Sequence, residues 1–176
     1  MIDGSHLDFE ENIAMTKHVV DLALSKGVSV EAELGKLVSK ESTDADAEDP
    51  YTDPDAAVEF FDRTGVDALA IASGTSHGAY KFKGDGKLDF ERLKAIRNKV
   101  DILLVLHGAS GVPASIVEMA TKYGAELCRA KGIPDEHIKR AVSLGIAKIN
   151  INTDLRLAFT ASVRKVLFTL SKEYDP

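Results

Sequence analysis

The sequence has no tryptophan, a single cysteine and no long apolar run. Because Cys128 has no second cysteine to pair with, the chain cannot be a disulfide-stabilised secreted domain. No apolar stretch reaches the roughly 18 residues that a transmembrane helix needs, and no signal-peptide core is visible. We therefore predict a cytoplasmic protein without a membrane partner.

Positive charge is also scarce. The 22 lysines and arginines are outnumbered by 28 aspartates and glutamates, which gives a formal net charge of −6 with the histidines neutral. Such a chain has no net positive field to gather a polyanion. The balance argues against nucleic acid as a partner.

The length sets a second limit. The 176 residues, 44% of them hydrophobic, suit one globular domain with its own core, whereas a complete (β/α)8 barrel typically needs about 250 residues. No linker or low-complexity tract divides the chain. We expect a single domain over residues 1–176.

Short apolar runs alternate with segments of helical period, a pattern typical of βα units around a mainly parallel sheet. The predicted strands cover residues 28–34, 68–73, 102–106 and 147–151, and residues 1–3 resemble the end of a fifth. The predicted helices cover 9–25, 53–65, 134–144 and 154–170, and two more start at 89 and at 112–113. One face of the last helix is apolar, comprising Leu155, Ala158, Phe159, Val163, Val166 and Leu170.

Polar side chains follow the apolar runs at Asp3, Glu33, His77, His107 and Asn150. The carboxyl ends of parallel strands meet at one face, so we expect these groups to converge. Two histidines and two carboxylates are a plausible metal-binding set. Taken singly, a histidine is more often a hydrogen-bonded structural residue than a metal ligand, and each carboxylate is more often a strand-end cap or loop anchor.

Glycine-rich turns at 74–78 and 107–111 allow backbone amides to approach an anion closely. Residues 150–154 join the last strand to the last helix, so their amides lie at a positive helix N-terminus. These segments suit a phosphate group. The alternative is an ordinary N-cap at Thr153 or Asp154 beside tight glycine turns.

Five motifs carry a family resemblance: MIDGSH at 1–6, VEAELG at 30–35, GTSHGAYK at 74–81, LHGASG at 106–111 and NINTDLR at 150–156. In this order, and through essentially the whole chain, they resemble the C-terminal part of class II, zinc-dependent fructose-1,6-bisphosphate aldolase. The resemblance implies an α/β fold, the (β/α)8 TIM barrel, with about the last five βα units present and the N-terminal units missing.

The resemblance also implies roles for metal-binding and catalytic residues. His77 and His107 match two of the family's three zinc histidines, and Asp3 and Glu33 match carboxylates of a second metal position. Glu41 matches an acidic proton shuttle on a mobile loop, although composition alone would make it one more solvated charge. The family's catalytic aspartate and third zinc histidine have no counterpart in this sequence. Val38, Ser39 and Lys40 replace the family's two glycines before the loop acid.

Further matches concern the substrate. The positions that would hold dihydroxyacetone phosphate are Gly78, Gly108, Ala109, Ser110, Asn150, Ile151, Asn152 and Thr153. A monovalent cation, K⁺ or Na⁺, is implied near the same glycine turns. Arg156 is typical of members that prefer fructose bisphosphate, since a guanidinium suits bidentate phosphate contact. Lys81 could meet a phosphate or solvent.

The implied activity is reversible, zinc-dependent cleavage of fructose 1,6-bisphosphate to dihydroxyacetone phosphate and glyceraldehyde 3-phosphate, in glycolysis and gluconeogenesis. One alternative is tagatose-1,6-bisphosphate aldolase. Another is a non-catalytic fragment that binds sugar phosphate or metal. The family also implies a homo-oligomer, a dimer or tetramer, and open sheet edges would gain from such partners.

Overall fold

The computed structural model describes residues 1–35, 51–74, 88–127, 132–170 and 172. Its centre is a parallel sheet whose strand order follows the chain. The strands are β1 (Glu31–Leu34), β2 (Ala68–Ile71), β3 (Leu103–Leu106) and β4 (Ile146–Ile149). The predicted runs all contain strands, but the strands are shorter, and β4 starts one residue earlier than predicted and ends two earlier.

The first residues of the chain lie beside β1. Ile2 forms a parallel bridge with Ala32, and its amide donates to the Glu31 carbonyl at 2.8 Å. Residues 1–3 therefore extend the sheet at the β1 edge, where the sequence predicted the end of a further strand.

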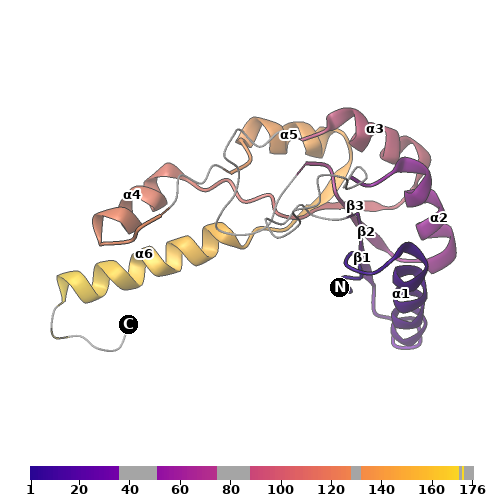
Figure 1. Cartoon of the computed structure of the whole chain (residues 1–176), viewed down its shortest axis with the longest axis horizontal. Helices are drawn as coiled ribbons and strands as arrows, with labels where there is room; N and C mark the ends of the chain where they lie inside the picture. The colour runs from indigo at the N-terminus through magenta and orange to yellow at the C-terminus, as the bar shows by residue number, and fades with distance from the viewer. Residues whose placement is uncertain (36–50, 75–87, 128–131, 171, 173–176) are drawn as a thin grey trace.

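Helices cover the outer face of the sheet. They are α1 (Phe9–Leu24), α2 (Pro54–Thr64), α3 (Phe90–Lys99) and α5 (Asp135–Ser143) (Figure 1). Their boundaries follow local chemistry, since Asp8, Asp53 and Asp89 each accept from a backbone amide in the first turn. Gly65 ends α2 with a left-handed φ of 69°, a conformation that glycine adopts without strain.

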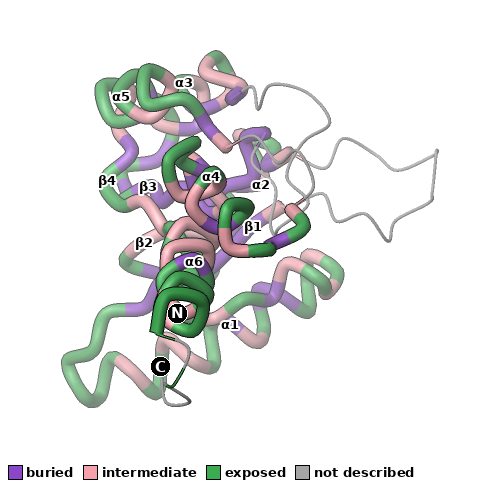
Figure 2. The backbone as a smooth tube through the Cα atoms, turned by 90° about the vertical axis from the view of Figure 1, so that its left-hand side faces the viewer, coloured by how far each residue is buried: buried purple, intermediate pink, exposed green. Residues whose placement is uncertain are grey.

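The core lies between the sheet and these helices. Leu69 and Ile71 of β2 and Leu104 of β3 are buried there with Phe60 of α2 and Leu93 of α3. Figure 2 shows buried residues concentrated along the strands. Each such side chain contributes about 1.5–3 kcal/mol on leaving water.

Two further helices, α4 (Ala114–Lys122) and α6 (Thr153–Thr169), pack on each other and project from the sheet as an arm (Figure 1). Their contact is a small alanine cluster of Ala120, Ala125 and Ala161. The predicted apolar face of α6 is only partly covered: Ala158, Val163 and Val166 are half-buried, but Leu155 is 64% and Phe159 71% exposed. The reason is that α6 turns another side, the one carrying Ala161, toward α4.

None of the helices in the described part of the chain combines the length and apolarity needed to cross a membrane.

Candidate active site

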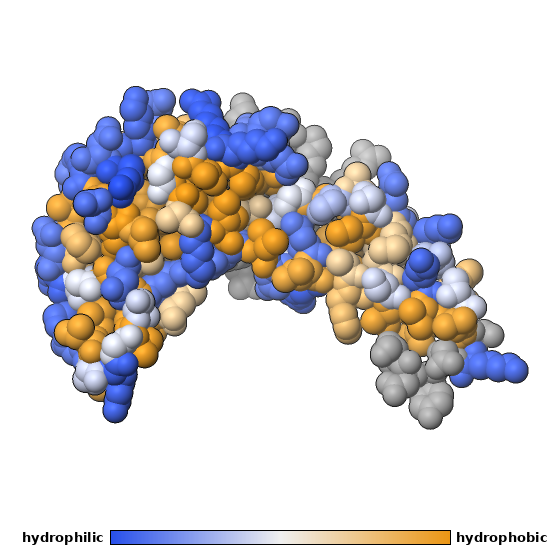
Figure 3. All heavy atoms as spheres, turned by 180° about the vertical axis from the view of Figure 1, so that it is seen from behind, coloured by the Kyte–Doolittle hydropathy of each residue, from blue (hydrophilic) through white to orange (hydrophobic). Residues whose placement is uncertain are grey.

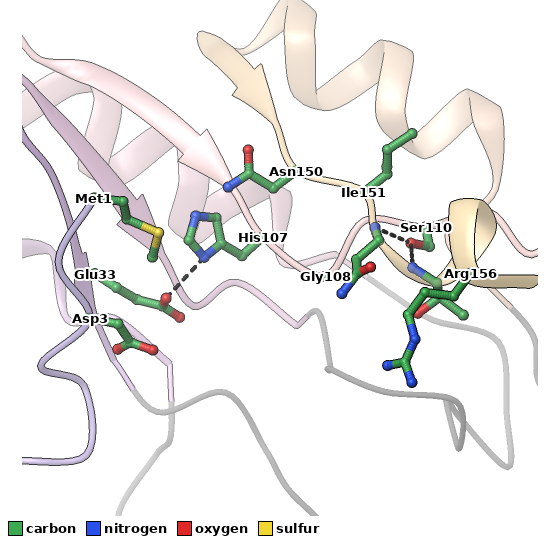
Figure 4. Close-up of a pocket in the computed structure, with 11 residues that line it drawn as sticks. Met1, Asp3, Glu33, His107, Gly108, Ser110, Asn150, Ile151 and Arg156 are labelled. Atoms are coloured by element: carbon green, nitrogen blue, oxygen red, sulfur yellow. Dashed lines mark hydrogen bonds and ion pairs between the residues drawn. The ribbon is translucent and has the colours of Figure 1, made fainter. Parts of the chain in front are cut away.

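A pocket of about 450 Å³ opens at the carboxyl ends of the strands (Figure 4). It is lined by Met1, Asp3, Glu33, His107, Gly108, Ser110, Asn150, Ile151, Asn152, Thr153 and Arg156. The singled-out residues from four separate chain segments therefore converge, as parallel topology requires. Ala109, also singled out, is buried and does not line the pocket. Glu41, His77, Gly78 and Lys81 lie outside the described residues.

Small residues on β2 let side chains from β1 and β3 meet. Glu33 pairs in register with Ala70, which pairs with Val105, so the three share one face of the sheet. Ala70 has only a methyl group on that face, while Leu69 and Ile71 point to the helices. The Glu33 carboxylate can therefore reach across β2 to His107.

His107 is the centre of a buried charged cluster. Its Nδ1 lies 2.9 Å from Glu33 Oε2, and its Nε2 lies 2.7 Å from Glu31 Oε1. Glu31 and Glu33 are two apart on β1 and so project from the same face. The Lys148 ammonium of β4 pairs with the other oxygen of Glu31. All of these groups lie on the face of the sheet opposite to the helices.

The cluster sets the charge of the imidazole. Burial acts to lower the pKa of His107, but hydrogen bonds and attraction from Glu33 and Glu31 outweigh it and raise this pKa above its usual value. Burial acts to raise the pKa of Glu31, and Lys148 and His107 together reverse this and lower it. The raised pKa of His107 and the lowered pKa of Glu31 both favour a protonated imidazolium between two ionised carboxylates.

The donor types near His107 suit a divalent metal ion. An imidazole and the carboxylates of Glu33 and Asp3 are nitrogen and oxygen ligands that zinc accepts. Within the described ranges, however, no group of three or more histidine, cysteine or acidic side chains is arranged to hold an ion. The described residues thus supply part of a ligand set, and an imidazolium must lose its proton before it binds metal.

The other end of the pocket is built where the loop after β3 meets α6. Ser110 Oγ accepts from the amides of Asn152 and Thr153, at 3.3 and 3.2 Å. The N-cap residue of α6 is Asn152, not Thr153 or Asp154, and its side chain forms no capping hydrogen bond. Ser110, from the loop after β3, caps the helix instead. Sequence spacing could not reveal an acceptor from another loop.

Asp154 ties the same two segments together. Its carboxylate accepts from the amides of Gly111 and Val112, at 2.9 and 2.8 Å. Val112 has a φ of 52°, a left-handed conformation that is costly for a β-branched residue. The Asp154 carboxylate therefore holds a strained turn beside the pocket.

Arg156 lies in the first turn of α6, and its guanidinium extends along the pocket (Figure 4). It forms no ion pair with any described carboxylate. A cation near a helix N-terminus is mildly unfavourable by itself, because both carry positive charge. An anion bound in the pocket would relieve this repulsion.

Sequence reasoning missed Glu31 and Lys148. The signal for Glu31 was the alternation in Glu31-Ala32-Glu33, which puts both acids on one face of a strand. The signal for Lys148 was a charge within an apolar strand, Ile146-Ala147-Lys148-Ile149. Neither signal identifies the partner, because the strands that carry them are at opposite edges of the sheet.

Comparison with known proteins gives consistent results. A family model described as fructose-bisphosphate aldolase class-II matches residues 1–176. Fructose-bisphosphate aldolase of Thermus caldophilus is 54% identical, over 100% of this chain and 58% of that protein. The Helicobacter pylori (strain 26695) enzyme of the same name is 46% identical, over 99% of the chain and 58% of that protein. The chain thus spans under two thirds of these relatives.

Solved structures agree on the fold. The YdjI aldolase of Escherichia coli K12 has a TM-score of 0.67 at 37% identity, with 98% of this chain and 50% of that chain covered. Fructose-bisphosphate aldolase of Campylobacter jejuni has a TM-score of 0.62 at 27% identity, with 99% and 47% covered. The predicted α/β class is confirmed, and the open parallel sheet corresponds to part of an aldolase barrel.

Proposed function

Because the chain belongs to the class II fructose-bisphosphate aldolase family, we propose that it acts in reversible cleavage of fructose 1,6-bisphosphate to dihydroxyacetone phosphate and glyceraldehyde 3-phosphate, within glycolysis and gluconeogenesis. The observation that carries this proposal is one pocket with two chemically different ends. His107, Glu33 and Asp3 lie at one end, and Arg156 and the start of α6 lie at the other.

We propose that the His107 end holds Zn²⁺, with Glu33 and Asp3 beside it and His77 as a further ligand. When bound, zinc supplies Lewis-acid stabilisation of the negative charge that C–C cleavage leaves on the ketose oxygen. The protein's part is to hold a neutral imidazole and two carboxylates at the edge of a polar pocket. Glu41 is proposed to move protons from its loop.

The Arg156 end is proposed to bind phosphate. Arg156 supplies a guanidinium fork, and Gly108 offers a backbone without a side chain to obstruct the ligand. Ser110, Ala109, Asn150, Ile151, Asn152 and Thr153 shape this end, and Gly78 and Lys81 are proposed to add contacts. A monovalent cation, K⁺ or Na⁺, is proposed near the same turns.

Arg156 also favours fructose bisphosphate over the tagatose isomer, because it is the residue typical of fructose-preferring members. We propose the cytoplasm as the place of action, and a homo-oligomer as the working form. The exposed apolar residues Leu155 and Phe159 of α6, with Leu170 at its C-cap, support association with a second copy.

The activity is tested in the complete enzyme, which also supplies the catalytic aspartate and third zinc histidine that this sequence lacks. The assay couples release of dihydroxyacetone phosphate to NADH oxidation, and it is run with each sugar bisphosphate in added zinc and in chelator. We expect cleavage that requires zinc and favours the fructose isomer. Arg156→Lys should raise KM about tenfold, equivalent to ~1.4 kcal/mol of binding. The matched control is Arg63→Lys, in an exposed pair with Glu10, which should change nothing. Chelator-resistant cleavage, or no cleavage of either sugar, would overturn the proposal.

A further inference from the structure

The buried glutamate behind His107 has no role in the function proposed so far. Glu31 does not line the pocket, and its side chain is only 9% exposed. Burying a carboxylate is costly unless it is paired and hydrogen-bonded. Its partners are the His107 imidazole, the Lys148 ammonium and, at a longer 3.5 Å, the Asn150 amide.

Glu31 and Glu33 hold opposite edges of the imidazole. Glu33 lines the pocket and lies against Nδ1, so Nδ1 is on the pocket side of the ring (Figure 4). Glu31, which does not line the pocket, lies against Nε2. The two ring nitrogens therefore have different surroundings, although both contact a carboxylate.

The two carboxylates also differ in what else they bind. The second oxygen of Glu31 is engaged by Lys148, which ties β1 to β4 across the sheet. A cation that enters the pocket on the Nδ1 side must replace the contact with Glu33, while the contact with Glu31 can persist. A carboxylate that accepts from the second nitrogen of a metal-bound histidine fixes its tautomer and orientation.

We propose that Glu31, held in place by Lys148, is the positioning residue that keeps the proton of His107 on Nε2 and so presents Nδ1 to the metal ion. This inference rests on the proposed function, in which His107 binds zinc. Lys148 acts indirectly: its ammonium group holds the Glu31 carboxylate in place, and that carboxylate orients the His107 ring.

The test uses Glu31→Gln, which keeps the side-chain shape but replaces one acceptor oxygen with a donor nitrogen. Zinc affinity is measured by calorimetric titration, and ¹⁵N NMR of the imidazole reports which nitrogen of His107 carries the proton in the zinc-loaded chain. We expect the proton on Nε2 in the wild type, and zinc affinity about 10–100-fold lower in Glu31→Gln. Lys148→Met should lower the affinity less, in the same direction.

Glu10→Gln is the matched control, because it also converts a paired glutamate to an amide, but in an exposed pair with Arg63. It should leave both readouts unchanged. A zinc-loaded wild type with the proton on Nδ1, or Glu31→Gln with unchanged zinc affinity, would overturn the inference and leave the proposed function standing. A wild type that binds no zinc would overturn both. If Glu31→Gln does not fold, the wild-type spectrum alone decides.

Discussion

At the scale of single residues, His107 shows how burial and charge oppose each other. The residue is 4% exposed, and such burial disfavours the charged form of the ring, but the two neighbouring carboxylates restore the charge. This imidazolium links β1 to the end of β3. The proton on this ring therefore has a structural role of its own, and the zinc ion proposed above would have to displace it.

This linkage predicts how stability depends on pH. The folded-state pKa of His107 is raised above the unfolded value of about 6.5, so its contribution is complete below that value and is lost as pH rises through the folded pKa. In urea unfolding of metal-free protein, His107→Gln should lose more stability relative to wild type at about pH 6 than at about pH 9. An equal loss at both would contradict the charged pairing. His18→Gln, an exposed site on α1, is the control.

At the scale of elements, the shape of the pocket depends on hydrogen bonds between the loop after β3 and the start of α6. Ser110 and Asp154 reach across this junction in opposite directions, each accepting from two amides of the other segment. The junction also brings Gly108 and Arg156 to the same end of the pocket. Loosening it should change both stability and phosphate binding.

The substitution Asp154→Asn tests the hydrogen bonds between these two segments. The amide keeps one acceptor oxygen, so one of the two bonds is lost and the turn at Val112 is less well held. We expect a loss of about 1–3 kcal/mol in the free energy of unfolding, as for a buried donor left without its partner. Calorimetric titration with inorganic phosphate should show weaker binding. Asp135→Asn, in the first turn of α5, should alter neither, and a similar loss there would argue for a general helix-dipole effect.

The elements themselves were largely predictable from sequence, because their signals are local. The Asp53 cap and Gly65 set the ends of α2 within a dozen residues of each other, and apolar runs located the strands. The partners within the site were not predictable. Glu31 meets Lys148 only because the four paired strands bring β1 and β4 side chains to the same face of the sheet, and Ser110 caps a helix from another loop. Such contacts join residues that are far apart in the sequence. They depend on how the strands and loops are arranged in space, which cannot be read from the pattern of a single sequence.

At the scale of the whole molecule, the α4 and α6 pair stands apart from the sheet and its covering helices (Figure 1). Figure 3 shows apolar side chains over this part of the surface, seen from behind. Leu155, Phe159 and Leu170 recur at helical spacing and are all more than half exposed. An apolar stripe of this kind is typical of a surface that associates.

We expect this stripe to mediate association with a second copy. Light scattering during gel filtration should give a multiple of the 19.0 kDa chain mass for the wild type. The double substitution Leu155→Gln with Phe159→Gln should shift it to the single-chain mass. Leu22→Gln with Leu24→Gln, two exposed leucines on α1, is the matched control and should not. Association that survives the α6 substitutions would locate the contact elsewhere.

The strand order of the sheet has a consequence for how the chain reaches its native state. Each strand pairs with the one before it, so the sheet can grow by successive docking of neighbouring βα units, without waiting for distant segments to meet. The charged cluster is different, because Glu31 lies on β1, His107 directly after β3 and Lys148 on β4. Until β4 has docked, Glu31 therefore lacks its Lys148 partner, and the charged cluster is completed only when all four strands are paired.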